Sequence, residues 1–386
     1  MFPRIENISD MLPYISDCSE IRVIEKGAYT VINYVVVTAD TFNAEKLSPE
    51  AYAMRKECRG IIFDTKSGRL IRRPYHKFFN LNEKPETMFS IVNMDEPHTI
   101  YDKLDGSMIA PFISNGKLYF GTKLGVTEAS ENAHNYAINK RNYRFFVGNM
   151  LDAGYTPIFE WCSPRQQIVI RYPKDMLVLT AVRDMYSGEY MSTDAMKRYA
   201  DHDEIPVVST KENTSSDLTS FVDNIKMLKD EEGVVIRFHS GHMLKIKAAE
   251  YLNIHRAKDT LHLEKNVLKI VLEDNEDDLI ANLPPEDAAK LSEYSNAVKN
   301  NIRNLAVKLF EIYNKADKGT KKDYALYVLE YFKEYSAMLF KIYDGHDAYE
   351  VVRNYLLTHT SSGAKVDSVR DIIGTKWNET LNEDEE

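Results

Sequence analysis

The sequence predicts an α+β protein in which a domain of antiparallel sheets with helices is followed by an all-α domain. The chain has 386 residues, and a chain of this length usually divides its interior between two cores. Short β-rich runs separated by turns fill the part from about residue 20 to 250, whereas apolar residues recur every three or four positions after about residue 255. We therefore expect two domains, at residues 1–254 and 255–386.

Eight short runs of β-branched, aromatic and other apolar residues justify the strands. They are YTVINYVVV, GIIFD, GKLYFGTK, TPIFEW, QIVIRY, MLVLTAVRD, GVVIRF and HMLKIK. Their spacing and the turns between them favour antiparallel sheets. Residues 128–152 predict a helix, because Phe145, Phe146 and Met150 recur at helical spacing.

Two long segments near the C-terminus justify the all-α domain. YSNAVKNNIRNLAVKLFEIYNKA and KDYALYVLEYFKEYSAMLFKIY carry apolar residues every three or four positions. Their aromatic residues could stack on bases, but helical spacing is more typical of a core. These residues are Tyr313, Tyr324, Tyr327, Tyr331 and Phe332.

Composition and charge limit the class of protein. Hydrophobic residues make up 44% of the chain and charged residues 28%, values typical of soluble globular domains. The net charge of -10 argues against a basic nucleic-acid-binding coat but allows a local cationic groove. With no signal peptide pattern or long apolar run, we expect a cytoplasmic protein without a membrane partner, and a monomer. Cys18, Cys58 and Cys162 give neither a disulfide framework nor a zinc site.

A lysine in the stretch YDKLDGSMIA is the centre of the candidate site. A Lys-x-Asp-Gly string such as the one at Lys103 is weak evidence alone, because Asp-Gly is common in turns and lysine is usually exposed. It is followed by Glu160 within the apolar run IFEW and by Glu232 at the start of EGVVIRF. Lys245 and Lys247 alternate in LKIK, so a strand would present both on one face, as a buried triphosphate requires.

Two more cations stand within apolar segments upstream. Arg59 lies in KECRGIIF and Lys77 in YHKFFNLNE. Each suits a phosphate or ribose contact. Taken singly, each is equally well explained as an exposed side chain whose stem covers apolar surface. The ten histidines form no regular ligand spacing, so we expect no histidine metal site.

These motifs resemble those of known enzymes. KLDGS, IFEW, EEGVV and LKIK are similar to the nucleotidyltransferase motifs of DNA ligases, RNA ligases and mRNA capping enzymes. ECRG, HKFFNLNE, YFGTK and SGEY resemble the phage RNA ligase 1 family, the ATP-dependent tRNA-repair ligases of T-even phages. The likeness runs from about Tyr29 to Tyr251. Met108 stands where DNA ligases and capping enzymes have an arginine, and helices follow where those enzymes have a β-barrel, so the RNA branch is favoured.

The resemblance implies a role for each candidate residue. Lys103 would take AMP from ATP as a phosphoramidate, Lys245 and Lys247 would contact the α-phosphate, and Glu160 would bind the ribose hydroxyls. Glu232 would act on a metal through water, and Tyr251 would be needed for activity unless it is a strand-end core aromatic. Arg183 would lie on a strand end near the site. The rest of the ATP pocket would comprise Tyr34, Arg59, Lys77, Phe79 and Lys123.

Asp277 and Asp278 in LEDNEDDLI match a paired aspartate of the family and are the predicted ligands of Mg²⁺ or Mn²⁺. Acidic residues at a helix start are otherwise more often caps or solvated charge.

We expect an ATP-dependent RNA ligase with three steps: lysyl-AMP formation, transfer of AMP to an RNA 5′-phosphate, and displacement of AMP by a 3′-hydroxyl. By resemblance, the helical domain would favour tRNA with a broken anticodon loop, in a phage-infected host cytoplasm. Two alternatives stay open. One is another nucleotidyltransferase, either a DNA ligase or a capping enzyme. The other is a non-catalytic RNA-binding relative.

Overall fold

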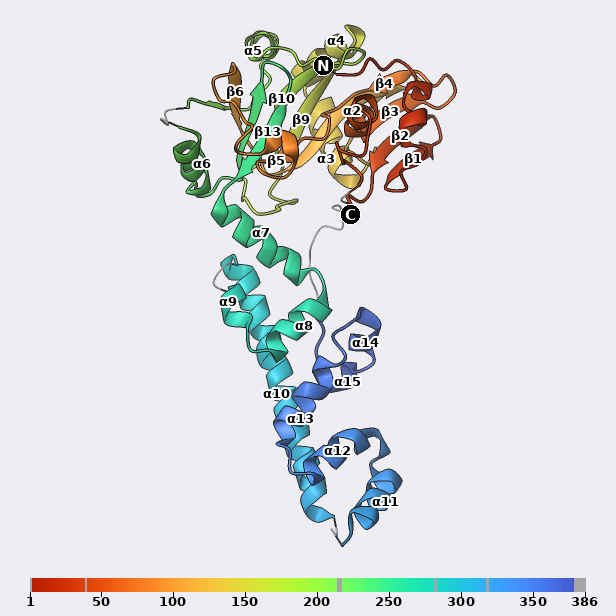
Figure 1. Ribbon diagram of the computed structural model, residues 1–386, viewed down its shortest axis with the longest axis vertical. Coiled ribbons are helices and arrows are strands. Elements are labelled where there is room, and N and C mark those ends of the chain that lie inside the picture. Colours follow the sequence, from red (N-terminus) through yellow and green to blue (C-terminus); the bar gives the residue numbers. More distant parts are fainter. Residues whose placement is uncertain (1, 39, 214–216, 281–282, 317–318, 378–386) are drawn as a thin grey trace. The chain divides into compact units, whose positions relative to one another are not determined.

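The computed structural model describes residues 2–38, 40–213, 217–280, 283–316 and 319–377 (Figure 1). The chain divides into two compact units, of which the first ends at Leu252 and the second begins at Asn253. Three sheets and several helices form the first unit, and the described residues of the second unit form helices alone. The α+β fold predicted from the sequence is confirmed.

Three sheets organise the first unit. The first has the order β1-β2-β3-β4 (Figure 1). The second has the order β10-β9-β7-β8 and the third β11-β6-β12-β13-β5. Neighbouring strands are antiparallel, as predicted, except for the short parallel pair of β13 and β5. The strands are β1 Ile21–Lys26, β2 Tyr29–Tyr34, β3 Arg59–Asp64, β4 Leu70–Arg72, β5 Phe79–Asn80, β6 His98–Asp102, β7 Ser107–Ser114, β8 Lys117–Gly121, β9 Tyr155–Cys162, β10 Met176–Asp184, β11 Thr210–Lys211, β12 Gly233–Phe238 and β13 Met243–Lys247.

Three predicted elements differ from the observed ones. The strand predicted over YTVINYVVV ends at Tyr34. QIVIRY forms no strand, because the backbone N–H groups of Val169 and Ile170 donate to the carboxylate of Asp105 instead of to a neighbouring strand. The helix predicted over residues 128–152 is two helices, since Lys140 is extended and interrupts it.

Helices cover the second and third sheets with apolar side chains. Phe146 of α4 is fully buried and packs against Phe159 of β9. Phe221 of α6 belongs to the cluster that contains Ile236 of β12. The first unit contains α1 Leu12–Ile15, α2 Pro49–Glu57, α3 Glu128–Ile138, α4 Arg141–Asp152, α5 Thr193–His202 and α6 Leu218–Lys226, with 3₁₀ turns η1 Ile8–Asp10 and η2 Pro85–Thr87.

The second unit is built on the long helix α10, Pro285–Lys315. The other helices of this part are α8 Glu264–Leu272, α9 Glu276–Ile280, α11 Lys321–Tyr331, α12 Ser336–Tyr343, α13 Ala348–Leu357, α14 Gly363–Asp367 and α15 Arg370–Ile373, with η3 Lys333–Tyr335. Helix α7, Ala249–Leu261, includes the residues at which the chain is divided.

The aromatic stripe of the second unit contributes to its core, as predicted. Tyr324 is fully buried, and Tyr313, Tyr327 and Phe332 pack half-buried against the same cluster. Tyr331 is the exception and is 62% exposed. Among the described residues, no helix combines the length and the apolar character needed to cross a membrane.

Candidate active site

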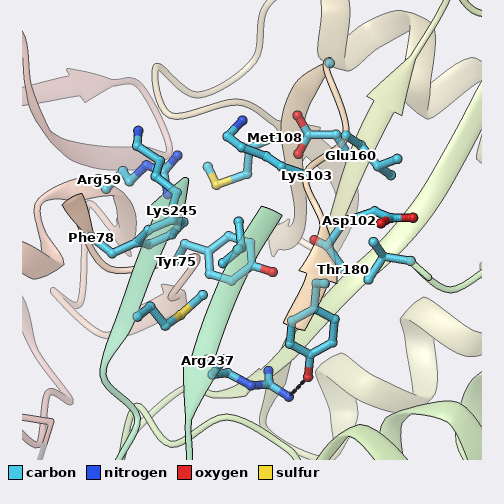
Figure 2. A pocket seen from close by; sticks show the side chains of 16 residues that line it. Arg59, Tyr75, Phe78, Asp102, Lys103, Met108, Glu160, Thr180, Arg237 and Lys245 are labelled. Carbon is cyan, nitrogen blue, oxygen red and sulfur yellow. Dashed lines mark hydrogen bonds between the residues drawn. The ribbon is translucent and has the colours of Figure 1, made fainter. Parts of the chain in front are cut away.

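A cavity lies between the second and third sheets of the first unit (Figure 2). Strands β6, β12 and β13 line one side, and β7, β9 and β10 line the other. Of the predicted site residues, Arg59, Lys103, Glu160 and Lys245 line it. The full lining is Arg59, Tyr75, Phe78, Tyr101, Asp102, Lys103, Leu104, Gly106, Met108, Glu160, Thr180, Val208, Val235, Arg237, Met243 and Lys245.

Glu232 joins two of the predicted lysines. The Nζ atom of Lys103 lies 2.6 Å from Glu232 Oε2, and Nζ of Lys247 lies 3.1 Å from Oε1. The strand register brings these groups together, because Gly233 pairs with Lys247 and the backbone N–H of Lys103 donates to Gly233 O at 2.9 Å. Only 3% of the Glu232 side chain is exposed. One buried carboxylate therefore holds two lysine amines.

Asp105 fixes the loop that follows Lys103. Its Oδ2 atom accepts from the N–H groups of Val169 and Ile170, both at 2.7 Å, and Oδ1 accepts from the hydroxyl of Tyr251 at 2.8 Å. Asp105 and Tyr251 are both 3% exposed. Tyr251 lies in helix α7, not at a strand end, and contacts the lysine loop directly.

Gly106 completes this fixed loop. A Cβ atom at this position would lie 2.3 Å from the carbonyl oxygen of Trp161. Any side chain there would push the loop away from β9. The close contact between the backbone at Gly106 and strand β9 therefore requires glycine, and it helps to set the position of the loop that carries Lys103.

Two ionisable groups in the cavity have strongly shifted pKa values. Burial raises the pKa of Glu160 to about 8, and the carboxylates of Glu232 and Asp105 raise it further against the opposing effect of the nearby cations. Burial, together with Lys103 and other cations, lowers the pKa of Lys245 to about 7. The site thus holds a carboxyl that retains its proton at neutral pH and a lysine that is close to half neutral. Such shifts are typical of functional sites.

A second cationic group surrounds Tyr34. Although burial raises the pKa of Tyr34, the nearby charges of Arg59, Lys77 and Lys123 lower it overall. The Nζ atom of Lys77 lies 5.3 Å from the Tyr34 ring centroid and 5.2 Å from that of Phe79. The predicted residues Tyr34, Arg59, Lys77, Lys123 and Phe79 are thus neighbours in the fold.

Phe79 is buried and is not among the residues that line the cavity. It is 1% exposed and supports Lys77. The adjacent Phe78 lines the cavity instead, with the Arg59 guanidinium carbon 5.4 Å from its ring centroid. Gly60 has a positive φ of 80°, and a Cβ there would lie 2.6 Å from the Cα of Lys123. A glycine directly after Arg59 therefore lets the Lys123 turn pack against this strand.

Arg183 lies at the end of strand β10 and is not among the residues that line the cavity. The guanidinium is fully buried and donates to both carboxylate oxygens of Glu57, at 2.8 and 2.7 Å. The rings of Phe2 and Tyr190 lie 4.7 and 4.9 Å from its central carbon. Arg183 is therefore a structural residue that connects β10 to helix α2.

The described residues give no support for the predicted metal site at the paired aspartates. Asp277 is exposed in α9, and the side chain of Asp278 lies outside the described residues. No group of three or more His, Cys, Asp or Glu side chains in the described ranges is arranged to hold a metal ion. The adjacent Glu276 is buried and accepts from Ser295 and Lys299. The acidic run thus includes a helix-packing contact.

Sequence reasoning missed several residues that shape the cavity. Arg237 lines it from β12, and the signal for it was present: a charged residue within an apolar strand, as for Lys245 and Lys247. Tyr75 and Phe78 flank the predicted Lys77. Asp102 gave no signal beyond its position next to Lys103.

Comparison with known proteins places this chain in a family. Residues 57–251 match the family described as RNA ligase. The chain belongs to the RNA ligase family. The predicted family is therefore confirmed, and with it the prediction that the protein is an RNA ligase enzyme. The matched region contains every predicted site residue of the first unit except Tyr34.

Relatives of this RNA ligase align with different fractions of its chain. A "Putative RNA ligase" of Thermovibrio ammonificans is 27% identical over 318 residues, covering 78% of this chain and 79% of the relative. RNA ligase 1 of bacteriophage TS2126 is 24% identical over 153 residues, covering 37% of this chain and 39% of the phage protein. An archaeal ATP-dependent RNA ligase is a structural neighbour with a TM-score of 0.45 and 13% identity, covering 64% of this chain and 62% of the neighbour.

Proposed function

We propose that this RNA ligase is ATP-dependent and forms a covalent lysyl-AMP at Lys103. The observation that carries the proposal is the placement of the Lys103 amine at the wall of a cavity, 2.6 Å from the buried Glu232. Lys247 and Lys245 stand beside it, and Arg59 lines the same cavity. Several cations around one carboxylate suit a triphosphate with a nucleophile beside it.

In the first step the neutral amine of Lys103 attacks the α-phosphorus of ATP. A nitrogen–phosphorus bond forms, the bond to the α–β bridging oxygen breaks, and pyrophosphate leaves. Glu232 is placed to accept the proton that the amine gives up. Lys245 and Lys247 would stabilise the charge that builds on the phosphorus centre and the pyrophosphate.

Glu160 is suited to hydrogen bonding with the ribose. With a pKa raised to about 8 by burial, it remains protonated at neutral pH and can donate as well as accept. Two vicinal hydroxyls offer both donors and acceptors. A neutral carboxyl also avoids adding negative charge beside the triphosphate.

The next two steps transfer AMP to RNA. The 5′-phosphate of one RNA end attacks the lysyl-AMP phosphorus, which frees Lys103 and leaves an RNA 5′-adenylate. The 3′-hydroxyl of the other end then attacks the RNA phosphate, a phosphodiester forms, and AMP leaves. The overall change consumes one ATP and gives AMP and pyrophosphate.

The donor set fits Mg²⁺ or Mn²⁺ bound mainly by ATP. Glu160 and Glu232 are close enough that Glu232 raises the pKa of Glu160. The Glu232 carboxylate together with triphosphate oxygens resembles the usual Mg²⁺ environment, in which few protein ligands are used. Glu232 would hold the ion, directly or through water. The ion would supply charge neutralisation of the triphosphate.

For the RNA we propose ends with a 5′-phosphate and a 3′-hydroxyl, and specifically tRNA broken in its anticodon loop. The support is the resemblance to phage tRNA-repair ligases and the helical unit that follows the matched region. We further propose that the protein acts as a monomer in the cytoplasm, including that of a phage-infected host. By resemblance, Met108 stands where DNA ligases and capping enzymes have an arginine, which favours RNA over nicked DNA or a cap as the substrate class.

Labelling with ATP carrying radioactive α-phosphate tests the proposal. The protein should become covalently labelled with Mg²⁺ present, and Lys103→Ala should abolish the label. Lys117→Ala, at an exposed position on β8, is the matched control and should label normally. A labelled Lys103→Ala protein would refute the assignment. Ligation of 5′-phosphorylated single-stranded RNA, cleaved tRNA and nicked DNA, compared side by side, tests the substrate class.

A further inference from the structure

Arg237 is a buried cation for which the described residues supply no counter-charge. Only 8% of it is exposed, and it forms no ion pair with any described carboxylate. It hydrogen bonds through one nitrogen alone, Nη2, which donates to the Tyr101 hydroxyl, to Met191 O at 3.3 Å and to Thr193 Oγ1 at 3.3 Å. Within the described residues, Nε and Nη1 donate to no acceptor. Burying a guanidinium without a counter-charge is costly.

The other buried arginines of this unit do not share this property. Arg72 also lacks a carboxylate partner among the described residues, but its Nε, Nη1 and Nη2 atoms all donate to backbone carbonyls. Arg55 is paired with Asp17, and Arg73 and Arg183 are paired with Glu57. The other buried guanidinium groups of the first unit thus have either a carboxylate partner or carbonyl acceptors for all three nitrogens, and Arg237 has neither among the described residues.

That location is the far end of the nucleotide cavity. Figure 2 shows Arg237 at one end and Arg59, Lys103 and Lys245 at the other, with the ring of Tyr75 between them. Arg237 stands on β12 opposite Met243 of β13, and Val235, two residues earlier, is opposite Lys245. Because residues two apart in a strand share a face, Val235 and Arg237 face the same cavity.

The residues that line the cavity differ in charge and polarity between its two ends. Arg59, Lys103 and Lys245 supply cations at one end, whereas Tyr75, Val208, Val235 and Met243 contribute aromatic and aliphatic surface and Asp102 and Thr180 contribute polar groups. Such surfaces accept the faces of a nucleobase. A base so placed would direct one edge at Arg237. Adenine carries three unsubstituted ring nitrogens, N1, N3 and N7, each of which accepts a hydrogen bond.

We propose that Arg237 reads the adenine base of ATP by donating a hydrogen bond from Nε or Nη1 to one of its ring nitrogens. The inference rests on the proposed function, because it takes ATP as the ligand of this cavity. The contact orients the base without taking part in bond making. Its effect is therefore expected on ATP affinity, with the chemical step at Lys103 changed much less.

Analogues of ATP that lack one ring nitrogen test the inference without altering the protein's fold. Binding of ATP, 1-deaza-ATP, 3-deaza-ATP and 7-deaza-ATP is measured by calorimetry with Mg²⁺. Lys103→Ala protein is used so that no covalent transfer occurs. We expect one analogue to bind about ten- to a hundredfold more weakly than ATP, the loss typical of one hydrogen bond from a charged donor. If all three bind within about threefold of ATP, the inference is wrong.

The variant Arg237→Met completes a double-mutant cycle. It should weaken ATP binding by about the same factor and should bind the sensitive analogue no worse than ATP. If the variant still discriminates against that analogue as strongly as before, another group reads the nitrogen and the inference is wrong. If Arg237→Met does not fold, Arg237→Lys, which keeps the charge, replaces it. This variant should reduce the ratio between the affinity for ATP and the affinity for the sensitive analogue. Failure of covalent labelling at Lys103 would refute the proposed chemistry but leave these binding ratios intact, so the two failures are distinguishable.

Discussion

Glu160→Gln should stabilise the first unit while impairing the reaction. The pKa of Glu160 is raised from 4.5 to about 8, primarily by burial. Below pH 4.5 both folded and unfolded states hold the proton, so the carboxyl costs nothing. As the pH rises from 4.5 to 8 the unfolded state loses the proton and the folded state retains it, so the folded state is progressively disfavoured. Glutamine cannot ionise and avoids this cost.

The expected gain follows from the size of the shift. One pKa unit corresponds to about 1.4 kcal/mol, so the variant should gain up to about 5 kcal/mol in free energy of unfolding at pH 9 and up to about 3 kcal/mol at pH 7. At pH 4 the gain should vanish. Because half-buried carboxyls are partly hydrated, these values are upper limits.

Urea unfolding followed by tryptophan fluorescence measures the gain. The chain has two tryptophans, and Trp161 is adjacent to Glu160 in β9. A Trp377→Phe background therefore makes the signal report on the first unit. Glu25→Gln, at an exposed position of β1, is the control and should change little. A gain that is the same at pH 4 and pH 9, or a loss at pH 9, would show that folding does not raise the pKa of Glu160 and would refute the reasoning.

Three further outcomes follow from the same structure. Burial and neighbouring cations lower the pKa of Lys245 to about 7, so this lysine loses its positive charge as the pH rises above 7. ATP affinity should then fall by up to about tenfold per pH unit, which calorimetric titrations from pH 6 to 9 would measure. Lys245→Arg should flatten this profile, and identical profiles would contradict the assignment. Tyr251→Phe removes the hydroxyl that donates to the Asp105 carboxylate, so urea unfolding should show a loss of about 1.5–3 kcal/mol and labelling should slow. Equal stability would mean that this bond contributes nothing. Glu57→Gln leaves the two buried arginines that it pairs without a carboxylate and should cost about 3–5 kcal/mol in thermal unfolding; an unchanged melting temperature would disagree.

The sequence predicted those parts of the fold and site that depend on local pattern. The strands over MLVLTAVRD and GVVIRF have the predicted bounds, and Lys245 and Lys247 both lie in strand β13. What it did not predict depends on contacts between distant segments. Asp105 accepts from a backbone amide 64 residues away, and this contact turns the apolar run QIVIRY into a loop. The resemblance put Arg183 on a strand end near the site, but its partner Glu57, 126 residues away in sequence, could not be predicted from local pattern.

Strand β12 fixes the separation of the two ends of the cavity. Glu232, just before the strand, holds the lysines, and Arg237 lies five residues later at the opposite end. An extended backbone rises about 3.3 Å per residue, so the strand sets a span of roughly 16 Å. Inserting or deleting one residue between these two would turn Arg237 to the opposite face of the sheet. In β12 a single length change would therefore separate selection of the nucleotide from the chemistry performed on it.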